Sequence, residues 1–79
     1  MADTKVPSEL NAIVWKIEVA AGQKVAAGDT LIILESMKME IPVTAPHAGI
    51  VSRILVAEQQ EVAEGDALVV VVTSAPAGG

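Results

Sequence analysis

An internal repeat limits the fold of this chain more than any other feature of its sequence. Shifting the chain by 37 residues places residues 12–35 on residues 49–72 without a gap, and 11 of the 24 aligned pairs are identical. About two or three identities would occur by chance in a chain so rich in Ala and Val. The repeat therefore predicts two equivalent halves. The identical pairs are Ile13/Ile50, Val14/Val51, Ile17/Ile54, Val19/Val56, Ala20/Ala57, Gln23/Gln60, Val25/Val62, Ala26/Ala63, Gly28/Gly65, Asp29/Asp66 and Leu31/Leu68.

Each copy has the pattern of three extended segments joined by turns. A strand of about eight residues opens the copy, a brief extended piece surrounds Val25 or Val62, and an aliphatic strand closes it. Gly-Asp occupies the same corner in both copies, and this dipeptide favours a turn because Gly adopts positive φ and Asp bonds to its own backbone. The closing strands, residues 31–34 and 68–72, are continuously apolar, which predicts strands covered on both sides or curling through a small barrel.

Composition agrees with one all-β domain. The chain has 79 residues, no Cys and a single aromatic residue, Trp15. A chain this short builds one core, and branched aliphatic side chains favour pleated structure. We therefore expect residues 1–72 to form the domain and residues 73–79, rich in Ala, Gly and Pro, to form a flexible tail. Trp15 is interpreted as a partly buried packing residue, near a β-bulge at Trp15 or Ser52 that the apolar pairs Ile13-Val14 and Ile50-Val51 suggest.

The charge balance excludes several classes of partner. A formal net charge of −5 repels nucleic-acid backbones and anionic lipid headgroups. No apolar run approaches the length of about 20 residues that spans a bilayer, and residues 1–5 show no secretory signal. We expect a cytoplasmic protein that is monomeric in isolation.

The segment between the two copies supplies one further strand and a turn. Residues 39–44 are expected to form the strand, and residues 45–48, which contain Pro46 and His47, the turn into the second copy. Residues 5–10 are the expected counterpart ahead of the first copy, with Pro7 restricting that strand to an edge or a strand start.

The sequence Glu35-Ser36-Met37-Lys38-Met39-Glu40 is nearly palindromic about its lysine and joins two strand-like runs. This layout predicts a hairpin in which Met37 and Lys38 form the two-residue connection, without the Asn-Gly or Asp-Gly that a tight primed turn favours. Holding non-glycine residues at positive φ costs about 1–2 kcal/mol, and functional sites often retain such strain. A lysine at this tip presents a nucleophilic amine to a second protein; the alternative is a solvated loop lysine flanked by methionines that complete the core.

In this setting the chain resembles the biotinyl domains of biotin-dependent carboxylases, whose signature is Met-Lys-Met. Here the motif is Met37-Lys38-Met39, preceded by Glu35 and followed by Glu40. Further matches are Gly28, Ala45-Pro46, Gly49-Ile50-Val51 and Gly65-Asp66, so the resemblance covers about residues 6–72. It implies a flattened barrel of two four-stranded antiparallel sheets with quasi-twofold symmetry. Two departures, Ser36 for the usual Ala and Asn11-Ala12 for a glycine-bearing turn, leave this assignment intact.

The resemblance also implies a function. Biotin protein ligase would attach biotin to Lys38 through an amide, and the biotin would carry a carboxyl group between biotin carboxylase and carboxyltransferase; the domain itself would catalyse nothing. Met37 and Met39 would pack on the barrel rim and present an apolar collar to partners, two interpretations that can both hold. Glu35 and Glu40 would pair with cations or stay solvated, with a possible part in ligase recognition. The gap-free repeat leaves no room for the protruding thumb of some carriers, so the chain is most similar to thumbless, free-standing members.

Other functions have less support. A lipoyl domain shares the architecture but usually has Asp-Lys-Ala at the motif, and an unmodified interaction module would leave Lys38 free. Catalysis has no evident nucleophile, and the only histidine, His47, is interpreted as a turn residue rather than a metal ligand.

Overall fold

The computed structural model describes residues 3–73, and this part of the chain is built entirely from strands and their connections. No helix in this range is long and apolar enough to cross a membrane. The strands, in chain order, are β1 (Asp3–Pro7), β2 (Ala12–Ile17), β3 (Lys24–Val25), β4 (Thr30–Ser36), β5 (Met39–Thr44), β6 (Gly49–Ile54), β7 (Glu61–Val62) and β8 (Ala67–Val72).

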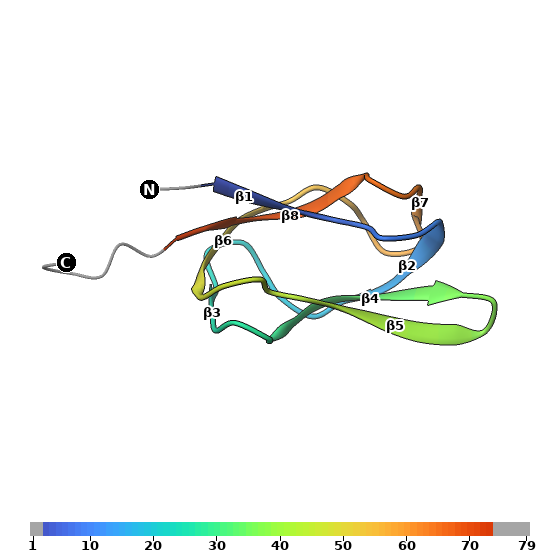
Figure 1. The fold of residues 1–79 in the computed structure, drawn as a ribbon, viewed down its shortest axis with the longest axis horizontal. Helices are drawn as coiled ribbons and strands as arrows, with labels where there is room; N and C mark the ends of the chain where they lie inside the picture. The colour runs from blue at the N-terminus through green and yellow to red at the C-terminus, as the bar shows by residue number, and fades with distance from the viewer. Residues whose placement is uncertain (1–2, 74–79) are drawn as a thin grey trace, which may run out of the picture.

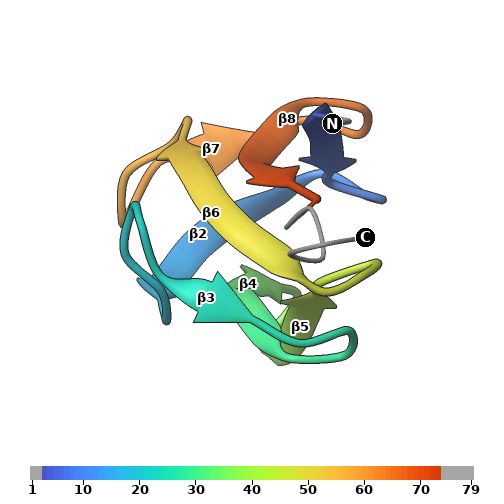
Figure 2. The same ribbon diagram turned by 90° about the vertical axis from the view of Figure 1, so that its left-hand side faces the viewer.

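Two four-stranded antiparallel sheets face each other, with strand orders β1-β8-β6-β3 and β5-β4-β2-β7. The 37-residue shift converts one order into the other, because β2, β3 and β4 correspond to β6, β7 and β8, and β1 corresponds to β5. The expected quasi-twofold sandwich is confirmed, and Figure 1 shows its two layers from the side. In the view along the long axis, β6 of one sheet and β2 of the other run as opposite diagonals, with β2 behind β6 (Figure 2).

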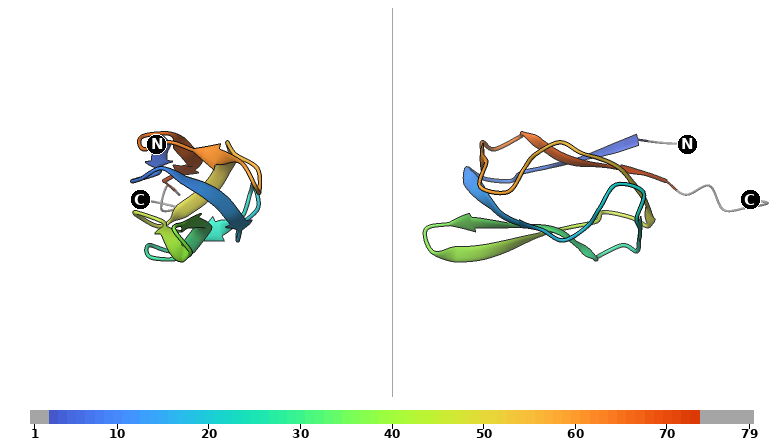
Figure 3. Two further views of the ribbon diagram at one scale, coloured as in Figure 1. Left: turned by 90° about the vertical axis from the view of Figure 1, so that its right-hand side faces the viewer. Right: turned by 180° about the vertical axis from the view of Figure 1, so that it is seen from behind.

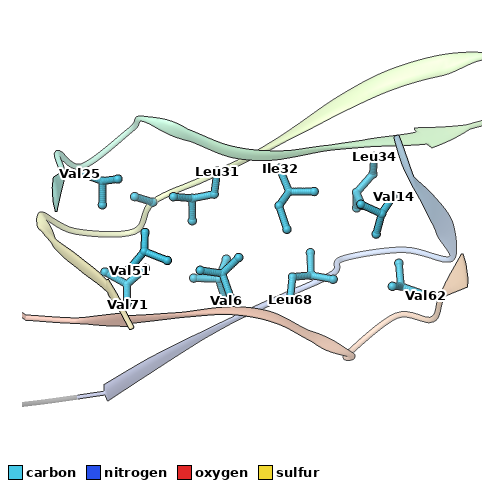
Figure 4. Close-up of a cluster of buried hydrophobic side chains, with 12 residues drawn as sticks. Val6, Val14, Val25, Leu31, Ile32, Leu34, Val51, Val62, Leu68 and Val71 are labelled. Carbon is cyan, nitrogen blue, oxygen red and sulfur yellow. The ribbon is translucent and has the colours of Figure 1, made fainter. Parts of the chain in front are cut away.

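The core between the sheets repeats the symmetry at several pairs of equivalent residues. Val14 and Val51 are both fully buried, as are Leu31 and Leu68. Figure 4 shows these side chains, with those of Val25 and Val62, pointing into the space between the layers. Burying a branched aliphatic side chain stabilises the fold by about 1.5–3 kcal/mol. The aliphatic core, with no disulfide, therefore accounts for most of the stability.

The closing strands are continuously apolar because each occupies an interior position in its sheet. β8 lies between β1 and β6, and β4 lies between β5 and β2. Val70 is only 2% exposed, although it is not part of the cluster of buried side chains between the two sheets. Its partners on the neighbouring strands are Lys5 and Arg53. The stems of long cationic side chains can cover apolar surface in this way. The expectation that these strands are covered on both sides is thus confirmed for β8.

The sequence suggested a bulge at Trp15 or Ser52, and the structure has one at each position, although Ile13 and Ile50 remain 38% and 40% exposed. The register of β2 against β4 shifts between Val14 and Lys16, and that of β6 against β8 shifts between Val51 and Arg53. Trp15 and Ser52 are therefore the extra residues. Trp15 is 41% exposed and stays outside the core cluster, so it is less buried than expected. A bulged residue has no direct partner across the ladder, which leaves its side chain free to turn outward.

The Gly-Asp corners use the turn chemistry expected from the sequence. The Ala26 N–H donates to Oδ2 of Asp29 at 2.8 Å, and the Ala63 N–H donates to Oδ2 of Asp66 at 2.9 Å. Both glycines, Gly28 and Gly65, have φ of +91°. The two halves thus turn by the same mechanism.

Three predicted boundaries need correction or fall outside the structure. The strand expected over residues 5–10 is β1, Asp3–Pro7, because Ser8 leaves the ladder and exchanges backbone hydrogen bonds with Gly65 and Asp66. The strands that open each copy have six residues rather than about eight. The proposed tail lies outside the described residues apart from Thr73.

Candidate functional site

The predicted hairpin forms at one end of the molecule. β4 pairs with β5 through Glu35 with Glu40 and Ser36 with Met39, so Met37 and Lys38 are the two-residue connection. This hairpin projects from one end of the sandwich, whereas β1 begins and β8 ends at the opposite end (Figures 1 and 3). Paired strands support the tip over the whole length of β5, so the tip is a stiff element rather than a loose loop.

Both residues of the tip have left-handed backbone conformations. φ is +52° at Met37 and +65° at Lys38. Two consecutive residues at positive φ define a type I′ turn, whose twist matches that of the flanking strands. Neither residue is glycine, asparagine or aspartate, so the turn retains backbone strain where Asn-Gly would remove it. The strain predicted from the sequence is therefore present.

The side chains at the tip are exposed to solvent. Met37 is 91% exposed, Met39 is 64% exposed, and Lys38 is also exposed. Within residues 3–73, the Lys38 amine makes no hydrogen bond or ion pair. The exposure of Met37 leaves it little packing on the barrel rim, and both methionine side chains form an exposed apolar surface beside Lys38; presentation of this surface to partners stays a prediction.

Glu35 and Glu40 lie directly opposite each other on the outer face of the sheet. Both are exposed, and neither is in an ion pair with a described residue; Lys16 and Glu18, 3.9 Å apart, form the ion pair in this part of the chain. Like charges in facing positions destabilise a strand pair slightly. Of the alternatives for these two carboxylates, solvation is the one observed.

Sequence reasoning missed a third carboxylate in this row. Ile13 pairs with Glu35 on one side and with Glu61 on the other, so Glu61 joins the outer face of the same sheet. The repeat aligns Glu61 with Lys24, and nothing in that alignment places it near the hairpin. The strand order β5-β4-β2-β7 shows that Glu61 lies near the hairpin, because β7 of the second half joins the sheet that contains β4 and β5.

The remaining candidates lie away from the hairpin or serve the fold. His47 bonds through Nε2 to the Thr4 hydroxyl at 2.7 Å and through Nδ1 to the Ala48 carbonyl at 2.8 Å, which confirms its structural role in the turn. No group of His, Asp or Glu side chains in residues 3–73 could hold a metal ion. Asn11 accepts a hydrogen bond from the Glu64 N–H at 2.9 Å, which explains how the glycine-free turn before β2 is held.

The connections from β2 to β3 and from β6 to β7 have the same length, residues 18–23 and 55–60. No additional loop protrudes between β2 and β3, as the sequence predicted. The hairpin is thus free of any covering loop from that connection.

Comparison with known proteins agrees with this geometry. The family described as "Biotin-requiring enzyme" matches residues 4–71. The chain belongs to this biotin/lipoyl family. Among solved structures, the Kluyveromyces lactis urea carboxylase is 38% identical, with a TM-score of 0.86 over 91% of this chain and 6% of that protein. A single-chain, multi-domain long-chain acyl-CoA carboxylase is 32% identical, also with a TM-score of 0.86, over 92% of this chain and 7% of that protein.

Small relatives of this biotin/lipoyl domain also occur. A biotinylated protein TB7.3 homolog of Mycobacterium leprae is 53% identical over 60% of this chain and 66% of its own length. A biotin/lipoyl attachment protein of Bacillus subtilis is 54% identical over 47% of this chain and 51% of its own length. The matched segment thus spans less than two thirds of either relative. The family is biotin-requiring, and the chain is homologous to domains of biotin-dependent carboxylases.

Proposed function

We propose that Lys38 is the attachment site for biotin and that the biotinylated domain carries a carboxyl group between the biotin carboxylase and carboxyltransferase sites of a carboxylase. The observation that carries this proposal is the exposed Lys38 amine at the apex of the β4–β5 turn, which has no hydrogen-bond or ion-pair partner among residues 3–73. Membership of a biotin-requiring family supports the choice of cofactor.

The residues of the hairpin fit an acylated lysine. Amide formation needs a neutral amine that attacks an activated carboxyl group, and an amine at the tip can enter the active site of a ligase without disturbing the core. The product amide has no charge, so the formal net charge changes from −5 to about −6. Because the Lys38 amine holds no ion pair in the described chain, acylation breaks no stabilising interaction.

A carrier needs a fixed attachment point and a mobile arm, and the hairpin and the lysine side chain supply these two features. The hairpin holds the attachment point away from the body of the domain, while the lysine stem and the biotin side chain supply the movement. Tethering replaces a bimolecular encounter by an intramolecular one and raises the effective concentration to about millimolar. When bound, biotin supplies the nitrogen that accepts the carboxyl group, and this chain supplies attachment, orientation and recognition.

Coexpression with biotin protein ligase tests the attachment site. The wild-type chain should gain one biotinyl group by intact mass and shift on avidin binding, whereas Lys38→Arg should gain none. Lys24→Arg, which changes another exposed lysine, is the matched control and should be labelled like wild type. An unmodified wild-type chain, or labelling of Lys38→Arg, would refute the proposal.

Two further assays address the finer parts of the proposal. Parallel coexpression with a lipoate ligase distinguishes the lipoyl alternative, because lipoate and biotin add different masses. Incubating the biotinylated chain with a biotin carboxylase and labelled bicarbonate should place label on the protein, and copurification with a tagged chain should recover the partner subunits. Absence of label on a fully biotinylated chain would contradict the carrier role alone.

A further inference from the structure

Sulfur is concentrated at the functional hairpin. The chain has no Cys and three Met. Within residues 3–73, the sulfur atoms are those of Met37 and Met39, which flank the proposed biotin site and are 91% and 64% exposed. Oxidation of methionine depends on access to the thioether. The side chains that an oxidant meets most readily are therefore the two that form the collar around Lys38.

The exposure of these methionines follows from the backbone. Met37 occupies the first position of the type I′ turn, at φ +52°, and Met39 pairs with Ser36 at the last rung of the ladder. The core beneath the hairpin is completed by Leu34, which is fully buried, and by the partly buried Ile41. The thioethers are thus not needed to fill the core, and a change in their polarity leaves the packing intact.

We propose that Met37 and Met39 form an oxidant-sensitive modification site that controls the recognition of Lys38. The co-reactant is a hydroperoxide. A lone pair of the methionine Sδ attacks one peroxide oxygen, an S–O bond forms, and the O–O bond breaks. Sulfur loses two electrons, and the proton of the transferred hydroxyl passes to the departing oxygen, which leaves as an alcohol, or as water when the peroxide is hydrogen peroxide. The sulfoxide is polar and chiral, and methionine sulfoxide reductases reverse the reaction.

Oxidation changes the surface that a partner meets without changing the fold. Two polar sulfoxides would replace the apolar collar on either side of the acceptor amine, and a partner pocket that matches thioethers would have to desolvate them. This inference rests on the proposed function in one respect, namely that Lys38 is the residue that the ligase acylates. The site and extent of oxidation do not depend on that proposal.

The first experiment locates the modification. The folded, unbiotinylated chain is treated with hydrogen peroxide and digested, and the peptide masses are measured by mass spectrometry. The hairpin peptide should gain two oxygen atoms, about 16 Da each, at a rate close to that of a free methionine derivative. The fluorescence of Trp15 and the circular dichroism should stay unchanged. Slow oxidation of the hairpin, or loss of the fold when it oxidises, would overturn the proposal.

The second experiment measures the consequence. The rate of biotinylation by a biotin protein ligase is compared for the reduced, the oxidised and the reductase-treated chain. The oxidised chain should react about tenfold more slowly, and the reductases should restore the rate. The variant with Met37→Leu and Met39→Leu keeps Met1, and its own rate should be the same before and after peroxide.

The outcomes separate the two proposals. If the reduced chain is not biotinylated at all, the proposed function is wrong. If the reduced and oxidised chains react equally fast, the function stands and the oxidant-sensitive site is refuted. If the double leucine variant also slows after peroxide, oxidation elsewhere in the chain is responsible, and this again refutes the assignment to Met37 and Met39.

Discussion

Gln59 is the point at which the two halves of the chain differ in backbone chemistry, and it yields a sharp prediction about stability. Its φ is +74°, and the equivalent residue in the first half is Gly22, at +91°. The surrounding hydrogen bonds are the same: the Gly22 N–H donates to the Val51 carbonyl, and the Gln59 N–H donates to the Val14 carbonyl, both at 2.7 Å. One turn thus contains glycine, and its copy contains a side chain that disfavours the same conformation.

The expected effect of Gln59→Gly follows from two opposing terms. Removing a side chain from the left-handed region recovers about 1–2 kcal/mol. Glycine has more freedom in the unfolded chain, which costs about 0.5–1 kcal/mol. The Gln59 side chain is exposed and makes no hydrogen bond within residues 3–73, so its removal loses little else. The net gain is about 0.5–1 kcal/mol, which raises the Tm of a domain this size by about 2–8 °C.

Urea unfolding followed by Trp15 fluorescence measures the change, with the reciprocal Gly22→Gln as the control. A Cβ at Gly22 would meet no atom within 4 Å, so this control introduces backbone strain without a clash. It should lower the free energy of unfolding by about the amount that Gln59→Gly raises it. If Gln59→Gly lowers the urea midpoint, the argument from backbone strain is wrong.

Three other changes test the fold and the hairpin. Gly49→Ala should lower the free energy of unfolding by about 2–4 kcal/mol in urea titration, because a Cβ there would clash with the Val72 carbonyl oxygen. An unchanged midpoint would show that β6 and β8 can separate at little cost. Met37→Asn should stabilise the domain by about 0.5–1 kcal/mol in thermal unfolding, because Asn tolerates positive φ, and a lower Tm would contradict the strain assigned to the turn. Met37→Leu combined with Met39→Leu should preserve folding and biotinylation but slow carboxyl transfer, and unaltered steady-state turnover would count against recognition by the collar.

Much of the fold could be predicted because the repeat supplies the same evidence twice. Gly28 and Gly65 mark one corner, and Val14 and Val51 mark one core position, so each assignment was supported by its copy. The hairpin was predictable for a related reason: a palindromic motif between two strand-like runs leaves little choice of turn. The boundary of β1 was not predictable, because the backbone bonds of Ser8 to Gly65 and Asp66 come from the other end of the chain.

The sequence by itself determined the duplication, the β class and the two-residue turn that carries Lys38. These features depend on patterns of polarity, turn residues and the repeat, which can be read from the sequence without knowing which strands become neighbours. The tertiary structure alone decided that Trp15 faces outward, that Glu61 joins Glu35 and Glu40 on one face, and that both methionines are left uncovered. These results depend on which strands become neighbours, and that choice is made by packing between segments far apart in the chain.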